Sequence, residues 1–203
     1  MSDGRPAEGR ERLLAAAIRH LETHGEAELR VTDIAEEADV AIGLIRHHFG
    51  SRDGLVAAAQ QRRIEGVTRE DLAGMRATLT EVADNDALMA RVIELTRAVT
   101  DRRRADVRLS RFAAIATAHG RPEAREAIGA TLGDLLDDLS VLIMEAQLRG
   151  LVRTDLDARA VATFLQAYSL GLIVHDLDPK DPDAGKLTDV IVTAVRAILS
   201  PPA

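Results

Sequence analysis

The sequence has no cysteine and no tryptophan, and aromatic residues make up only 2% of the chain. Without cysteine there can be no disulfide framework, no thiol nucleophile and no cysteine-ligated zinc site. No stretch reaches the roughly 20 consecutive apolar residues that a membrane span needs, and the first ten residues carry charges where a signal peptide has an apolar segment. We therefore expect a cytoplasmic protein with an aliphatic core and no membrane partner.

Basic charge is also scarce. The 203 residues have a net charge of −7, and residues 1–60 contain 7 Lys and Arg against 11 Asp and Glu. A protein that coats nucleic acid without sequence preference has a broad basic surface, which this chain lacks. Any binding to DNA must therefore depend on a few well-placed cations.

The residues that are abundant favour helices. Hydrophobic residues make up 46% of the chain, and they recur at helical spacing, with no convincing strand pattern. We predict an all-α protein with a three-helix, helix-turn-helix domain over residues 9–55. A long fourth helix joins it to a larger helical domain over residues 56–200. Residues 1–8 are expected to form an arm before the first helix, and the pattern does not decide whether residues 66–82 extend the fourth helix.

Residues 31–55, VTDIAEEADVAIGLIRHHFGSRDGL, have the pattern of two short helices around a tight turn. Ala35 allows the two helices to approach closely, and Asp39 tolerates the backbone conformation that a tight turn needs. Val40 supplies an apolar side chain that fixes the turn. This arrangement is how a helix-turn-helix protein presents its second helix to the major groove of DNA.

The second helix of this motif is apolar on one side only. Ile45 and Phe49, four residues apart, are predicted to face inward. Arg46 is predicted to face outward, where its planar fork suits O6 and N7 of guanine; the alternative is a solvated charge. His47 and His48 do not suggest a metal site, because adjacent helical residues point about 100° apart. We therefore predict a DNA-reading helix and no metal.

The segment resembles the DNA-binding domain of the TetR (tetracycline repressor-like) family. The matching residues are Ile34, Ala35, Ala38, Val40, Gly43, His48, Phe49, Ser51 and Leu55. The sequence departs from the family pattern at Asp39, where glycine is usual, at Ala41, where serine is usual, and at Arg46, where tyrosine is common. The stretch GLVRTDLDARAVATFLQAYSLGLI also resembles the family's penultimate helix.

The motif and the resemblance together give a set of expected DNA-binding residues. Arg30 and Thr32 are expected at phosphates, and Arg52 is expected at a phosphate from the start of the fourth helix. The complete predicted set is Arg30, Thr32, Ile42, Gly43, Leu44, Arg46, His47, His48 and Arg52. The expected partner is a double-stranded DNA operator.

The resemblance implies that the larger domain binds a small-molecule effector of unknown identity and forms a homodimer through its last two helices. Apolar residues in residues 160–172 and 190–197 exceed what one core face requires, although a core within one chain also explains them. An apolar effector pocket is expected from Met89, Val92, Phe112, Met144, Leu148, Phe164 and Tyr168. Each of these residues has plain core packing as its alternative.

The sequence favours a ligand-responsive transcriptional regulator, most simply a repressor, over two other classes. A di-iron helical enzyme requires Glu-x-x-His on core helices, and that spacing is absent. No Ser/His/Asp grouping or glycine-rich phosphate loop indicates another enzyme, and no cofactor is expected. A helical DNA-binding or interaction protein without an effector is the remaining alternative.

Overall fold

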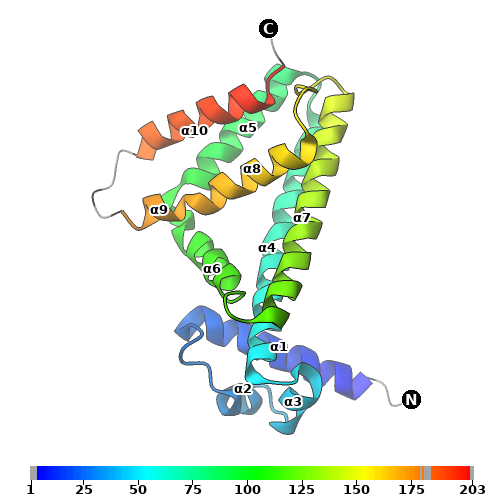
Figure 1. Cartoon of the computed structure of the whole chain (residues 1–203), viewed down its shortest axis with the longest axis vertical. Coiled ribbons are helices and arrows are strands. Elements are labelled where there is room, and N and C mark those ends of the chain that lie inside the picture. Colours follow the sequence, from blue (N-terminus) through cyan, green and yellow to red (C-terminus); the bar gives the residue numbers. More distant parts are fainter. Residues whose placement is uncertain (1–3, 179, 181–183, 202–203) are drawn as a thin grey trace. The chain divides into compact units, whose positions relative to one another are not determined.

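The computed structural model describes residues 4–178, 180 and 184–201, and this part of the chain is helical without strands (Figure 1). The all-α prediction is thus confirmed. The helices are α1 (Gly4–His24), α2 (Val31–Glu37), α3 (Gly43–Phe49), α4 (Arg52–Glu81), α5 (Asn85–Thr100), the 3-10 turn η1 (Arg102–Arg104), α6 (Ala105–Ala116), α7 (Pro122–Leu148), α8 (Ala158–Gly171), α9 (Ile173–Asp176) and α10 (Ala184–Leu199).

The chain divides into two compact units. The first consists of Met1–Gly66 and Ala113–Thr131, and the second of Val67–Phe112 and Leu132–Ala203. The chain passes from one unit to the other within α4, α6 and α7. This division differs from the predicted boundary at residue 55, which falls inside the continuous helix α4.

The first unit has an aliphatic core in which α2 and α3 both pack against α1 (Figure 1). The largest fully buried side chains include Leu13 of α1, Ile34 of α2 and Leu55 of α4. Ile45 is 4% exposed and attaches α3 to the same core. Burying a side chain of this size stabilises a fold by roughly 1.5–3 kcal/mol, so these contacts hold the two short helices in place.

Helices α5 and α8 each begin at an aspartate side chain that caps the helix. The side chains of Asp84 and Asp157 accept hydrogen bonds from Ala87 N and Ala160 N, both at 2.8 Å. Such a bond satisfies a free backbone N–H at the start of a helix. Gly150, with a positive φ of 69°, follows shortly after the end of α7.

The structure differs from the predicted start of the first helix and assigns the stretch that was left undecided. Helix α1 begins at Gly4, so most of the arm expected over residues 1–8 is helical, and residues 1–3 lie outside the described part of the chain. Helix α4 continues to Glu81 and includes most of the undecided stretch. Helix α8 ends at Gly171 and is followed by the short helix α9.

The second unit packs α5, α7, α8 and α10 around an aliphatic core with the later part of α4. A buried ion pair also lies in this unit. Arg108 of α6 donates to both carboxylate oxygens of Asp176 at 2.5 Å, and it donates further bonds to the Val99 and Asp101 carbonyls. Within the described chain, no helix is both long enough and apolar enough to span a membrane.

Candidate nucleic-acid interface and ligand cavity

The turn between α2 and α3 has the conformation that its sequence predicts. Asp39 has a φ of 51°, in the left-handed region that aspartate tolerates better than most residues. Val40 N donates to Ala35 O at 3.1 Å, which closes the turn, and the Val40 side chain packs on the core. The turn is therefore fixed from both sides, by a backbone bond and by an apolar contact.

The outward side of α3 carries part of the predicted DNA-binding set. Arg46, His47 and Gly43 are exposed, and Ile42 just before the helix is 49% exposed. These residues recur at positions i, i+1, i+4 and i+5, which is one face of a helix. Because Ile45 anchors the opposite side, this face points away from the core and is free to enter a groove.

The start of α2 adds two more exposed residues from the predicted set. Arg30 and Thr32 lie at the first turn of the helix, and the Thr32 hydroxyl donates to Asp33 at 2.9 Å. Backbone N–H groups at a helix start and an exposed cation are both suited to a phosphate. The structure therefore brings six of the nine predicted residues to the surface: Arg30, Thr32, Ile42, Gly43, Arg46 and His47.

Leu44 and His48 turn inward instead. Leu44 is half-buried and packs on the core of the first unit. His48 is also half-buried, and its Nε2 is a buried atom without a hydrogen-bond partner among the described residues. Burial lowers the pKa of His48, and the nearby His47 and Arg10 lower it further. Because His48 Nε2 is buried and Leu44 packs on the core, these two predicted residues do not belong to the exposed face of α3.

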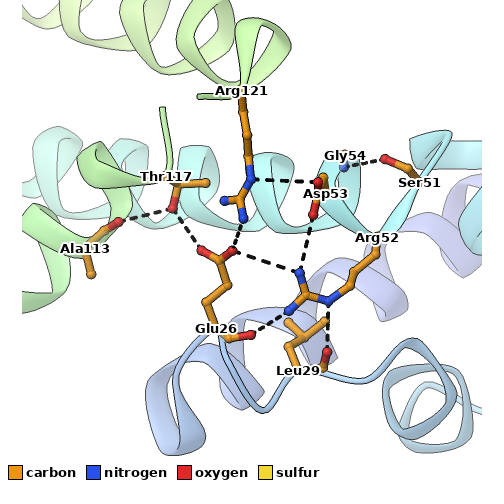
Figure 2. Close-up of polar contacts among 9 residues, drawn as sticks. All are labelled: Glu26, Leu29, Ser51, Arg52, Asp53, Gly54, Ala113, Thr117 and Arg121. Carbon is orange, nitrogen blue, oxygen red and sulfur yellow. Dashed lines mark hydrogen bonds and ion pairs between the residues drawn. The ribbon is translucent and has the colours of Figure 1, made fainter. Parts of the chain in front are cut away.

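Arg52 was expected to contact a phosphate, but its donors are used inside the unit (Figure 2). Its Nη2 donates to Glu26 O at 2.6 Å and its Nε to Leu29 O at 3.0 Å. These bonds join the start of α4 to the loop between α1 and α2. The guanidinium therefore holds the loop that precedes α2 against the start of α4. Because these donors are used within the unit, we no longer assign Arg52 to a phosphate.

Figure 2 shows that Arg52 belongs to a larger cluster of polar residues in the first unit. Arg121, just before α7, donates from Nη2 to Glu26 Oε1 at 2.5 Å, and its Nε lies 3.8 Å from Asp53. The Thr117 hydroxyl donates to the other Glu26 oxygen at 3.3 Å. Sequence reasoning missed this cluster because its partners are up to 95 positions apart.

Ser51 and Gly54 shape the start of α4. Ser51 Oγ accepts a hydrogen bond from Gly54 N at 3.0 Å, which caps the start of α4. A Cβ on Gly54 would lie 2.0 Å from the backbone oxygen of Phe49. Only glycine therefore fits at this position, which explains a residue that otherwise weakens a helix.

The second unit contains a cavity of about 420 Å³, a size typical of small-molecule sites. Aliphatic side chains from α4, α5, α7, α8 and α10 form most of its wall, among them Leu79, Val92, Leu142, Leu165 and Val195. Tyr168 is the one aromatic residue in the described lining. Burial raises the pKa of its phenol, and a hydrogen bond with Thr96 opposes this rise.

The cavity includes two of the seven residues predicted for an effector pocket. Val92 and Tyr168 line it, whereas Met89 is buried in the surrounding core and is not part of the lining. The other four are partly or largely exposed: Phe112, Met144, Leu148 and Phe164. The difference comes from the faces of the helices on which these residues lie. On α7, for example, the residues that face the cavity are Leu139, Leu142, Ile143 and Ala146, and not Met144 or Leu148.

Comparison with known proteins gives a family match in the first unit. Residues 13–59 match the family described as bacterial regulatory proteins, tetR family. The chain is 37% identical over 68 residues to the HTH-type transcriptional regulator BetI of Stenotrophomonas maltophilia (strain R551-3). This match covers 34% of the chain and 34% of that relative, and so extends over about a third of each protein.

Solved structures of similar fold cover nearly the whole chain. A TetR-family transcriptional regulator of Mesorhizobium loti has a TM-score of 0.72 at 16% identity, with 98% of this chain and 100% of that chain covered. A transcriptional regulator of Saccharomonospora viridis in complex with choline has a TM-score of 0.65 at 23% identity, with 96% and 99% covered. At these identities the likeness concerns the fold.

Proposed function

We propose that this chain, a member of the TetR family of bacterial DNA-binding regulators, is a repressor that a small, largely apolar effector releases from its operator. The observation that carries the proposal is the exposed face of α3. It presents Arg46 and His47 while the rest of the helix is anchored in an aliphatic core. A cavity of ligand size in the second unit supports the proposal that an effector binds this chain.

Operator recognition is assigned to the exposed residues around α3. Arg46 reads a guanine through its two-pronged guanidinium, and Ile42 offers an apolar contact to a thymine methyl group. Arg30 and Thr32 contact phosphates and fix the register of the protein on the duplex. Since residues 1–60 have few cations, specificity depends on the geometry of this face more than on general attraction to DNA.

A homodimer is assigned to the exposed faces of α8 and α10, which have no packing partner among the residues that the structure describes. Ala160, Phe164 and Ala167 of α8 are exposed at positions i, i+4 and i+7. On α10, Val190 is 66% exposed and shares a face with Ala194 and Ala197. Two such faces from each copy fit a four-helix interface around a two-fold axis. The two α3 helices would then read half-sites about 34–36 Å apart.

Effector control is assigned to a shift between two populations of the dimer. An effector that binds one conformation more tightly enriches that conformation, and its α3 spacing need not fit the operator. Helix α6 contributes residues to both units along the chain. It carries Arg111, which lines the cavity. The residue after its end, Thr117, donates a hydrogen bond to Glu26 in the loop that precedes α2.

A helical DNA-binding protein without an effector is the alternative, and the cavity argues against it. Choline, bound by one structural neighbour, is a poor candidate for this chain. Recognition of a quaternary ammonium group uses several aromatic faces, and the described lining of the cavity has only Tyr168.

The proposed function is tested by selection from a random duplex DNA library with the purified full-length protein. The expected result is a palindromic sequence with half-sites one duplex turn apart. A protein that enriches no sequence, or that sediments as a monomer at micromolar concentration, contradicts the proposal. Reporter expression with the selected sequence in front of a promoter then separates repression from activation.

A further inference from the structure

The cavity of the second unit has one polar corner in its otherwise aliphatic wall. Arg111 of α6, Gln166 of α8 and Asp71 of α4 meet there. The same three residues border a second, much smaller space of about 10 Å³, which is about the room that one water molecule needs. Arg111 thus lines both spaces.

Arg111 uses few of its hydrogen-bond donors. Among the described residues it makes one hydrogen bond, from Nη2 to Gln166 Oε1 at 3.2 Å, and its Nη1 lies 3.9 Å from Asp71. A guanidinium has five N–H donors. Arg108, one turn earlier on α6, directs four hydrogen bonds to protein oxygens. The contrast marks Arg111 as a group with donors left for a ligand.

Among the described side chains at this corner, positive charge exceeds negative charge. Asp71 is shared between Arg111 and Arg104, whose Nη2 lies 3.7 Å from it. Two cations beside one carboxylate leave one positive charge, and Arg111 has the more buried side chain of the two arginines, at 20% exposed against 37%. Arg91, elsewhere in the lining, is paired with Glu94 at 3.0 Å. We therefore assign the uncompensated positive charge to Arg111.

Burial makes this surplus positive charge unfavourable. Loss of solvent lowers the pKa of Arg111, Asp71 opposes that change, and Arg104 adds to it. A bound anion restores the solvation that the guanidinium has lost. Gln166 assists, because its Oε1 is turned toward Arg111 and its Nε2 remains as a donor next to the same corner.

We propose that the cavity binds a monocarboxylate with an elongated apolar body, its carboxylate at Arg111 and Gln166 and its body along the aliphatic wall. The proposal rests on the proposed function, since it names the chemical class of the effector. A carboxylate fits because its two oxygens match the fork of a guanidinium. Its single negative charge also equals the surplus at this corner.

Other ligand classes fit less well. A cation would meet Asp71, but two arginines already share that carboxylate. A neutral alcohol of the same length gains the wall contacts and leaves the charge of Arg111 uncompensated. A small hydrophilic anion leaves the aliphatic wall empty.

The first test compares three amphiphiles of equal chain length on the full-length protein by calorimetry: decanoate, decanol and decyltrimethylammonium. We expect decanoate to bind at least ten-fold more tightly than either of the others. Tyr168 is the only tyrosine of a chain without tryptophan, so a change in tyrosine emission on titration reports binding in this cavity. Equal affinities, tighter binding of decanol or decyltrimethylammonium, or no binding with unchanged emission would each overturn the proposal.

The second test uses two matched variants. Arg111→Met keeps the length of the side chain and removes its charge, and it should abolish the preference for decanoate over decanol. Arg91→Met removes a lining arginine that is already paired, and it should keep the preference. Thermal unfolding checks that both variants are folded. If Arg111→Met retains the preference, the assignment of the carboxylate to this corner is wrong.

The result of these ligand tests can be distinguished from the result of the DNA selection that tests the proposed function, because ligand binding is measured without DNA. A protein that selects a DNA sequence but does not prefer decanoate leaves the function standing and removes the ligand class. A protein that prefers decanoate and selects no DNA sequence has the binding site without the regulatory role.

Discussion

The guanidinium of Arg121, just before α7, bonds to the carboxylate of Glu26, just after α1, at 2.5 Å (Figure 2). Both side chains are about 30% exposed. The same carboxylate lies 4.0 Å from Arg52 and accepts a bond from Thr117. The loop that precedes the helix-turn-helix is therefore held by residues from α4 and from the α6–α7 segment, all within the first unit.

This pairing predicts a measurable coupling. Glu26→Ala leaves Arg121 and Arg52 without their shared carboxylate, and the free energy of unfolding should fall by about 1–2 kcal/mol. A double-mutant cycle with Arg121→Ala should give an interaction energy of roughly 0.5–1.5 kcal/mol. Urea unfolding of the four proteins measures both quantities. Additive effects of the two substitutions would show that the pair contributes nothing beyond its separate contacts.

Arg52→Ala should act mainly on stability. Its guanidinium holds the Glu26 and Leu29 carbonyls, so we expect a loss of about 1–3 kcal/mol in the free energy of unfolding. The salt dependence of DNA binding should remain that of the unmodified protein. A phosphate contact would instead reduce the slope of log K against log salt by about 0.9. That reduced slope, with stability unchanged, is the opposing result.

Asp39→Gly should stabilise the first unit. A residue other than glycine in the left-handed region costs roughly 1–2 kcal/mol, and aspartate somewhat less, so the gain should be about 0.5–1 kcal/mol. Asp39→Ala serves as the control and should give no gain, because alanine has the same backbone restriction. If both variants gain equally, the side chain of Asp39 and not its φ of 51° is the source of the strain.

Gly54→Ala should destabilise the protein although alanine normally favours a helix. The added Cβ would lie 2.0 Å from Phe49 O, and relief of such overlap typically costs about 1–3 kcal/mol. Gly66→Ala is the matched control in the same helix, because its Cβ would meet nothing within 4 Å. That variant should gain roughly 0.5–1 kcal/mol. Thermal unfolding of both variants in parallel measures the two changes in stability.

Local features of the chain were predictable from the sequence. Asp39, Val40 and the caps at Ser51, Asp84 and Asp157 depend on residues only a few positions apart, and their roles follow from short-range chemistry. The positions of the two short helices α2 and α3 followed from apolar spacing for the same reason.

Features that depend on exact helix phase or on distant partners were not predictable. Leu44 and His48 lie near the edge of the outward face of α3, so a small rotation decides whether each faces DNA or the core. The role of Arg52 depends on carbonyls 23 and 26 positions away. The cavity lining depends on which face of α7 meets α5 and α8, and apolar residues such as Met144 occur on more than one face of that helix.

Arg46 carries the central claim, and one measurement tests it most directly. Sequence selection from a random duplex library is repeated with Arg46→Ala and with Arg62→Ala, an exposed arginine of α4 paired with Glu11. We expect Arg46→Ala to lose about 1–3 kcal/mol of specific binding and to relax one base position in each half-site, whereas Arg62→Ala keeps the selected sequence. Equal loss of affinity for selected and random DNA in Arg46→Ala, with every base preference intact, would contradict the role of α3 in reading the operator.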